Sequence, residues 1–186
     1  MAMRAFVALD ISNPQVLESI VAFQRELSAT GADLKMVERE NIHFTVKFLG
    51  EVTENQALDV DARLKRLHLS KADVEVKGVG AFPSIGRPRV VWAGVPRAHE
   101  ERVKPIAEGV LIALDGIGEQ DRRPFAAHAT LGRVRTGRGS TELTSVLRSN
   151  ADRPFGEISF ENLKLKSSVL GPRGPTYEDI GVYPLV

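Results

Sequence analysis

The sequence contains no cysteine among its 186 residues. This absence excludes a disulfide framework, a thiolate metal site and a thiol nucleophile. Long apolar runs are also lacking, because no stretch approaches the ~20 residues that a membrane helix needs. The first ten residues, MAMRAFVALD, contain too short an apolar run for a signal peptide. We therefore expect a cytoplasmic protein that makes no contact with a membrane.

An excess of charge of one sign is lacking as well. Lys and Arg number 25 against 24 Asp and Glu, which gives a formal net charge of +1. This balance argues against a polybasic binder, although it leaves room for a local positive groove. The length suits one well-packed domain or two small lobes that share a core. Since no linker or low-complexity segment interrupts the chain, we expect residues 1–186 to form a single bilobal domain, and we expect a monomer.

Apolar periodicity and turn residues predict the secondary structure. Strands are expected within residues 4–9, 34–37, 42–49, 72–79, 89–95, 126–134, 157–170 and 176–183. Helices are expected at 14–29, from a capping box at Thr53 through Leu67, at 103–114 and at 141–148. Ser12 is expected to cap the first helix, and Pro105 to lie in the first turn of the third. Residues 82–88 are interpreted as a Pro/Gly loop and 171–175 (GPRGP) as a turn.

Helical and strand patterns alternate irregularly along the chain. Several strands show the alternation that is typical of half-exposed antiparallel sheets. Together these patterns predict an α+β fold. We interpret it as two pseudo-symmetric lobes, each with an antiparallel sheet and flanking helices, with a cleft between them.

One expected strand carries polar side chains at alternate positions. Residues i and i+2 of a strand point to the same side of the sheet. In NIHFTVKFLG (41–50), one side is therefore expected to hold His43, Thr45 and Lys47. The other side is apolar and holds Phe44, Val46 and Phe48. We interpret the polar side as part of a site and the apolar side as part of a core.

A second strand, AAHATLGRV (126–134), repeats this arrangement with His128 and Thr130. Arg133 lies off their parity and can join them only if the strand bends near Gly132, which glycine permits. If the two lobes face each other, two imidazoles and two hydroxyls converge on one cleft.

Two classes of site compete to explain a pair of histidines. Zinc sites usually take three or four His, Cys or carboxylate ligands, and neither motif has a carboxylate at ligand spacing, so no metal is expected. A Ser-His-Asp hydrolase needs only one histidine, and the chain has no Gly-x-Ser-x-Gly segment. Neither class explains the duplicated motif.

Paired acid–base catalysis on a phosphodiester fits the duplication best. Displacement at phosphorus needs a base beside the attacking oxygen and an acid beside the leaving oxygen. Two imidazoles with a pKa of about 6.5 can hold opposite protonation states at neutral pH. Thr45 and Thr130 are candidates for holding the non-bridging oxygens, and Lys47 or Arg133 for offsetting the charge that builds up there. The residues alone leave open which histidine is the acid.

Plainer interpretations exist beside these. The two histidines would then be interior residues, the threonines ordinary strand residues, and Lys47 a solvated edge lysine. Phe82 is a candidate for stacking on an RNA base, and Tyr177 is a weaker candidate at the rim of the cleft. Trp92, within RVVWAGV, is interpreted as a core residue.

The paired H-x-T-x segments, HFTV and HATL, resemble the signature of the 2H phosphoesterases. The wider pattern is similar to the RNA 2′,3′-cyclic phosphodiesterases, also known as 2′-5′ RNA ligases. The similarity extends over most of the chain, through MRAFVALDI, ENIHFTVKFLGEV, RVVWAGV, HATLGRV and LKSSVLGPRGPTYE. That family often has proline before the second histidine, where this chain has Ala127. The difference affects local stiffness more than chemistry.

The resemblance implies a bilobal α+β fold with no metal and no organic cofactor. It implies hydrolysis of a terminal 2′,3′-cyclic phosphate of RNA to a 2′-phosphomonoester, with His43 as the proton donor and His128 as the acceptor that activates water. It also implies a secondary 2′-5′ RNA ligase activity. Two alternatives stay open, namely an enzyme acting on a small cyclic-phosphate nucleotide and a non-catalytic binder of RNA ends.

Overall fold

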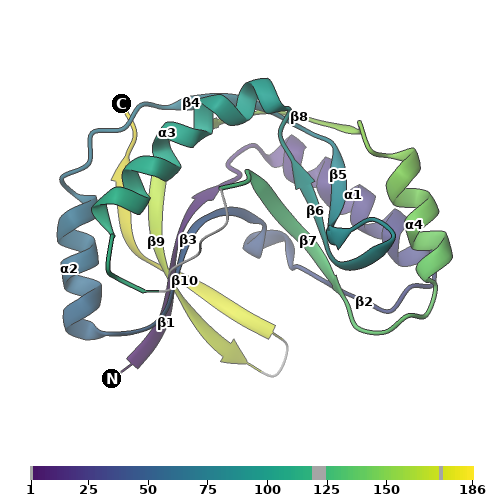
Figure 1. Ribbon diagram of the computed structural model, residues 1–186, viewed down its shortest axis with the longest axis horizontal. Helices are drawn as coiled ribbons and strands as arrows, with labels where there is room; N and C mark the ends of the chain where they lie inside the picture. The colour runs from purple at the N-terminus through teal and green to yellow at the C-terminus, as the bar shows by residue number, and fades with distance from the viewer. Residues whose placement is uncertain (1, 119–124, 172–173) are drawn as a thin grey trace.

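The structure, a computed structural model, describes residues 2–118, 125–171 and 174–186 (Figure 1). The elements are β1 (Ala2–Asp10), α1 (Pro14–Ala29), β2 (Leu34–Met36), the 3₁₀ helix η1 (Arg39–Asn41), β3 (His43–Thr53), α2 (Glu54–Leu64), β4 (Ala72–Lys77), β5 (Val79–Ser84), β6 (Arg87–Gly94), α3 (Arg97–Ala113), β7 (His128–Val134), α4 (Ser140–Ser149), β8 (Pro154–Phe160), β9 (Asn162–Gly171) and β10 (Gly174–Pro184). Four α-helices therefore accompany antiparallel strands in the described residues, which confirms the predicted α+β class.

The main sheet has eight strands in the order β10-β9-β1-β3-β7-β6-β5, with β2 also paired to β7. One pair of residues, Phe44 and Ala129, joins β3 to β7. The sheet thus consists of two four-stranded halves, β10-β9-β1-β3 and β2-β7-β6-β5, and β3 and β7 each carry one motif. The two sheets expected from the sequence are these halves of one continuous sheet. Figure 1 shows them as the two sides of an arch.

Helices cover each half of the sheet on its outer side. α2 and α3 pack against β3, whereas α1 packs against β7 and α4 against β5. A small second sheet of β4 and β8 contacts both α3 and α1 and so spans the two halves (Figure 1). The apolar stripe of α1 has helical spacing and is fully buried, at Val16, Ile20, Phe23 and Leu27.

Two helix starts follow from the sequence, one with a different cap. The helix at 14–29 is confirmed, but Asn13 and not Ser12 caps it, with its side chain accepting a hydrogen bond from the Gln15 amide. Because Pro14 occupies the first helical position, the cap falls on the residue directly before it. The capping box of Thr53 and Gln56 is confirmed in full.

The expected loop at 82–88 is wrong. β5 and β6 form an antiparallel hairpin in which Pro83 pairs with Pro88. Proline is tolerated there because β5 is an edge strand, and β6 pairs with β7 only from Val90 onward.

Three expected elements also differ in their boundaries. The strand expected at 157–170 is two strands, β8 and β9, which are separated at Glu161 and belong to different sheets. The third helix begins at Arg97, so Pro105 lies inside it and not in its first turn. The start was missed because residues 97–102 are helical but have no apolar stripe. The expected strand at 72–79 divides at Gly78, whose φ of 89° ends β4 before β5 begins. The turn at 171–175 falls partly outside the description, since 172–173 are not among the described residues.

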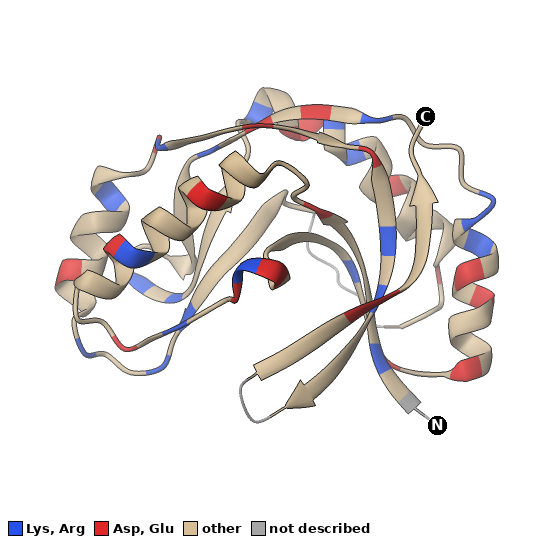
Figure 2. Cartoon of the chain, turned by 180° about the vertical axis from the view of Figure 1, so that it is seen from behind, with Lys and Arg blue, Asp and Glu red and all other residues tan. Residues whose placement is uncertain are grey.

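Charges of both signs are interspersed over the helices and strands (Figure 2). Several basic side chains pair with acidic ones at the surface, as Arg153 does with Glu26 at 2.7 Å. Within the described residues, no helix combines the length and apolar content needed to cross a membrane.

Candidate active site

The two motifs meet where the halves of the sheet join. Phe44 and Ala129 form an antiparallel pair, and both side chains are fully buried. Because side chains alternate, the His and Thr of each motif flank this pair on the opposite face. Because the two strands are antiparallel, His43 stands opposite Thr130 and Thr45 stands opposite His128. His43 and His128 are then diagonal neighbours, whose usual spacing is about 7–8 Å.

Each motif strand contains a β-bulge at the same distance from its histidine. The register of β1 with β3 skips Val46, and that of β6 with β7 skips Leu131. Both skipped residues lie three positions after the histidine. A bulge inserts one residue and so reverses the alternation that follows it. The bend expected near Gly132 is therefore present, and the residue five positions after each histidine turns to the site.

The residues brought to the site by these bulges are Phe48 and Arg133. Both line a cavity of about 460 Å³ together with His43, Thr45 and Thr130. Lys47 is 7% exposed and is not among the lining residues, whereas Phe48 is 54% exposed. The expectation that Lys47 shares the face of His43, with Phe48 on the apolar side, is therefore wrong. The bulge exchanges the two positions.

Both imidazoles are held through the same nitrogen. Nδ1 of His43 lies 2.7 Å from the carbonyl oxygen of Asn41, and Nδ1 of His128 lies 2.7 Å from that of Ala126. A carbonyl only accepts, so Nδ1 must carry the proton in each ring. Nε2 is therefore the nitrogen that can take up or release a proton during a reaction. In His43 it lies 3.0 Å from the hydroxyl of Thr45.

Aromatic rings pack around His43. Phe6 of β1 stacks on the imidazole at 4.9 Å between centroids, and Tyr177 of β10 meets it edge-on at 5.5 Å. Burial lowers the pKa of His43, although the hydrogen bond to Asn41 and the charge of Asp10 oppose this. The charge of His128 also lowers the pKa of His43, which places the two rings within electrostatic reach. The free protein therefore favours a neutral His43.

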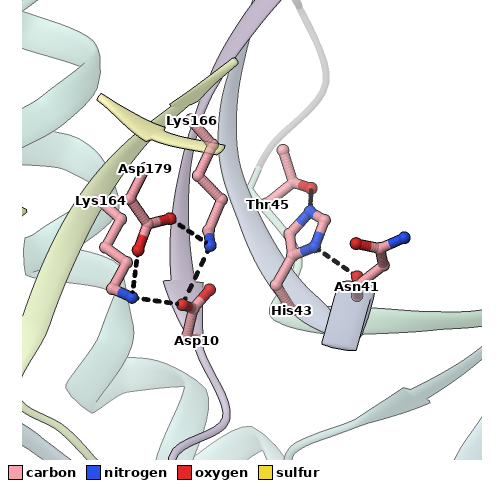
Figure 3. A network of polar contacts seen from close by, with 7 residues as sticks. All are labelled: Asp10, Asn41, His43, Thr45, Lys164, Lys166 and Asp179. Carbon is pink, nitrogen blue, oxygen red and sulfur yellow. Dashed lines mark hydrogen bonds and ion pairs between the residues drawn. The ribbon is translucent and has the colours of Figure 1, made fainter. Parts of the chain in front are cut away.

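An ion-pair network lies beside the first motif (Figure 3). Asp10, which pairs with His43 across β1 and β3, contacts Lys164 at 2.9 Å and Lys166 at 3.0 Å. Asp179 of β10 contacts the same two lysines at 2.6 and 2.7 Å. Two positive and two negative charges thus balance. In the second motif Gly94 pairs with His128, so a carboxylate lies at this register position only beside His43.

His128 is flanked by a different pair of rings. Phe82 meets its ring edge-on at 4.9 Å, and Trp92 lies 6.3 Å away. Trp92 is partly exposed, but its indole nitrogen is buried and its ring packs on Gly80, where an added Cβ would lie 2.3 Å from the indole, so the interpretation as a core residue holds for part of the ring. Neither Phe82 nor His128 is among the lining residues of the cavity, which opens on the His43 side.

Tyr177 lies in the cavity wall, at the place expected for a rim residue. Burial raises the pKa of its hydroxyl, and the positive charge of Arg133 opposes this. Tyr177 of β10 and Arg133 of β7 thus line the cavity from the two halves of the sheet.

Two functional candidates were not found from the sequence. Asn41 is buried, and its side-chain amide donates to the carbonyl of Pro175 at 3.0 Å. Gln24 of α1, also buried, donates to the carbonyl of Leu131 at 2.8 Å and so holds the bulge of β7. Gln24 directly follows the apolar run IVAF, which is a signal that could have identified it, whereas Asn41 follows the charged residues 38–40 and carries no such signal.

The cavity wall presents the imidazole of His43, the hydroxyls of Thr45 and Thr130 and the guanidinium groups of Arg4 and Arg133, while His128 is the diagonal neighbour of His43 outside the lining residues. Among the described residues, no three His, Asp or Glu side chains gather in a way that could hold a metal ion. Two imidazoles at this diagonal spacing can exchange protons with two oxygens of one phosphorus that binds between them. The hydroxyls and Arg133 can bind the oxygens that do not react.

Known proteins resemble this chain in sequence and in fold. Residues 9–92 match the family model described as LigT-like phosphoesterase. An RNA 2′,3′-cyclic phosphodiesterase of Archaeoglobus fulgidus is 37% identical over 97% of this chain and 99% of its own length. An RNA 2′,3′-cyclic phosphodiesterase of Methanocaldococcus jannaschii is 34% identical over 96% of this chain and 98% of its own length. A crystal structure from Thermus thermophilus superposes with a TM-score of 0.75 at 28% identity, over 98% of both chains. The crystal structure of E. coli LigT complexed with 3′-AMP has the same fold, with a TM-score of 0.75 at 21% identity over 100% of this chain and 99% of its own.

Proposed function

We propose that this chain, which belongs to the LigT-like phosphoesterase family, hydrolyses the terminal 2′,3′-cyclic phosphate of RNA to a 2′-phosphomonoester. One observation carries the proposal, namely the register that sets His43 and His128 diagonally across the junction of β3 and β7. The proposed reaction uses protein side chains alone, without a metal ion or an organic cofactor.

Each histidine has one role in the proposed reaction. His128 takes a proton from water at Nε2 while the water oxygen forms a bond to phosphorus. The bond from phosphorus to the 3′ oxygen breaks on the opposite side, and Nε2–H of His43 protonates that oxygen. The phosphate stays on the 2′ oxygen. A positioned acid or base typically contributes on the order of 10²–10⁴ in rate.

Thr45, Thr130 and Arg133 bind the oxygens that do not react. In the free protein the Thr45 hydroxyl donates to the neutral Nε2 of His43. Burial keeps His43 neutral until substrate arrives. An anionic phosphodiester beside the ring then favours the imidazolium, since an opposite charge within ~4–6 Å stabilises the charged form. Substrate binding thereby loads the acid with its proton.

The proposal assigns two further residues. Phe82 braces His128 through its edge contact and remains the candidate for stacking on a base. Lys47 has no direct contact with substrate in this proposal, because it lies on the other side of β3 from the cavity. The enzyme is proposed to act as a monomer in the cytoplasm, on RNA ends.

Product analysis tests the reaction. An RNA oligonucleotide that ends in a 2′,3′-cyclic phosphate is incubated with the protein in EDTA, and the phosphate position is read by ³¹P NMR. We expect a 2′-phosphate, at the same rate with and without the chelator. A 3′-phosphate, or loss of the reaction in EDTA, contradicts the proposal.

Two related activities follow from the same displacement. A ribose 2′-hydroxyl in place of water as the nucleophile would join RNA ends by a 2′-5′ linkage, which is the proposed secondary activity. A small cyclic-phosphate nucleotide as the main substrate is the alternative. Rates on a cyclic-phosphate oligonucleotide and on the matching mononucleotide separate the two substrate classes.

A further inference from the structure

The histidine of the second motif is joined to a carboxylate through a single peptide group. Its Nδ1–H donates to the carbonyl oxygen of Ala126 at 2.7 Å. The other end of that peptide bond is the amide of Ala127, which donates to Oε1 of Glu100 at 2.9 Å. Glu100 lies in the first turn of α3. One planar group therefore connects this carboxylate to the imidazole.

The first motif holds the equivalent peptide by a different means. The amide of Ile42, directly before His43, donates to the backbone carbonyl of Arg39 at 3.3 Å in the turn of η1. Residues 125–127 belong to no helix or strand. The amide of Ala127 is bound instead by a side chain 27 residues away in the sequence. Because Ala127 is buried, water is poorly placed to replace this acceptor.

This contact fixes the direction of the peptide and strengthens its carbonyl as an acceptor. In a trans peptide the N–H and the C=O point in opposite directions, so a partner that fixes one also fixes the other. Hydrogen bonds in a chain polarise one another, and a charged acceptor gives the stronger bond. In the proposed reaction His128 takes up a proton at Nε2. The imidazolium then forms with its Nδ1–H already directed at a polarised carbonyl.

We propose that Glu100 is a positioning residue that orients His128 through the Ala126–Ala127 peptide and stabilises the imidazolium that forms there. This inference rests on the proposed function and adds a residue that does not line the cavity. Proline has no N–H, so a chain with proline at position 127 cannot make this contact and must hold the peptide by the stiffness of its ring. The alanine that replaces the proline often found in the family is therefore what makes the contact possible.

Removal of the acceptor tests this role. kcat and KM on a cyclic-phosphate RNA are measured for Glu100→Ala, for Glu100→Gln and for Glu101→Ala, the control at an exposed neighbour on α3. Glu100→Ala should lower kcat by about 10- to 100-fold with little change in KM, because the residues that bind the phosphate are intact. Glu100→Gln keeps an acceptor oxygen and should recover part of this loss. Glu101→Ala should lose nothing, and urea unfolding of each variant separates a lower kcat from a loss of folded protein.

A proline at position 127 makes the test specific to this contact. In Ala127→Pro no N–H is present for Glu100 to accept, so adding Glu100→Ala should cost no further kcat. A wild-type kcat in Glu100→Ala, or the same loss with and without Ala127→Pro, overturns the inference. If Ala127→Pro does not fold or turn over, Glu100→Gln decides, and a loss as large as that of Glu100→Ala overturns it. A wild type that cleaves no cyclic-phosphate RNA refutes the proposed function itself, which is a distinct outcome.

Discussion

Among the four residues of the ion-pair network, Lys166 should contribute most to the free energy of unfolding. Its ammonium contacts Asp10 at 3.0 Å and Asp179 at 2.7 Å, and its side chain is only 9% exposed. Lys166→Met keeps the apolar stem and removes the charge. Two carboxylates then share the single remaining cation, Lys164 (Figure 3).

The cost follows from these contacts. The hydrogen bond from Lys166 to Asp179 and its ion pair with Asp10 are each assigned the about 1.5–3 kcal/mol of a charged hydrogen bond, which gives about 3–6 kcal/mol together. The side chains of Asp10 and Asp179 are 30% and 33% exposed, so water recovers part of this. We expect Lys166→Met to lower the free energy of unfolding by about 3 kcal/mol at pH 7.

The pH dependence of this loss has a definite sign. Burial alone would raise the pKa of Asp179, but its hydrogen bonds to Lys164 and Lys166 outweigh burial and lower it. The associated stability is complete above the unfolded pKa of about 3.9 and is lost as the pH falls through the folded value. The difference between Lys166→Met and wild type should therefore shrink below about pH 4.

Urea unfolding of a double-mutant cycle checks the magnitude. In Lys166→Met/Asp179→Asn the remaining Lys164 and Asp10 balance each other, so the double variant should be more stable than the sum of the single effects by at least about 1 kcal/mol. NMR titration gives a second readout. Burial is the main cause that lowers the pKa of His43 and the charge of Lys166 adds to it, so the variant should raise that pKa. If the losses of unfolding free energy in the two single variants add up in the double variant, and the pKa of His43 does not change in Lys166→Met, the reasoning is refuted.

Three further predictions concern the supports of the site. Gln24→Met removes the donor to the carbonyl of Leu131, so unfolding free energy should fall by about 1–3 kcal/mol and KM should rise, measured by urea unfolding and steady-state kinetics. Asn41→Ala removes the bond to Pro175 but keeps the backbone carbonyl, so KM should rise more than kcat falls. Burial lowers the pKa of His43, so stability should be complete above about pH 6.5 and decline below it, by at most about 1.4 kcal/mol per pH unit. His43→Gln should lack this decline in unfolding curves from pH 5 to 7.

Local signals predicted the parts of the fold that depend on neighbours in the chain. Pro14 and the apolar stripe behind it fix α1, and Thr53 with Gln56 fixes the start of α2. The alternation of side chains around His43 and around His128 likewise predicted β3 and β7. Residues i and i+2 of a strand share a face regardless of which strand lies beside it.

Features set by distant partners escaped prediction. The bulge at Val46 depends on how β1 pairs with β3, and no residue type in HFTVKF indicates a bulge. The exchange of Lys47 and Phe48 follows from that bulge. Gly132 did indicate a bend in β7, which is why the placement of Arg133 could be anticipated and that of Phe48 could not.

The central claim is that His43 and His128 act as one pair on one phosphorus, and mutant kinetics test it most directly. kcat/KM on a cyclic-phosphate RNA is measured for His43→Gln, His128→Gln and their combination, with His68→Gln as a control outside the site. Each single variant should lose on the order of 10²–10⁴ in rate, with little further loss in the double variant and none in the control. A single variant with the wild-type rate would contradict the account.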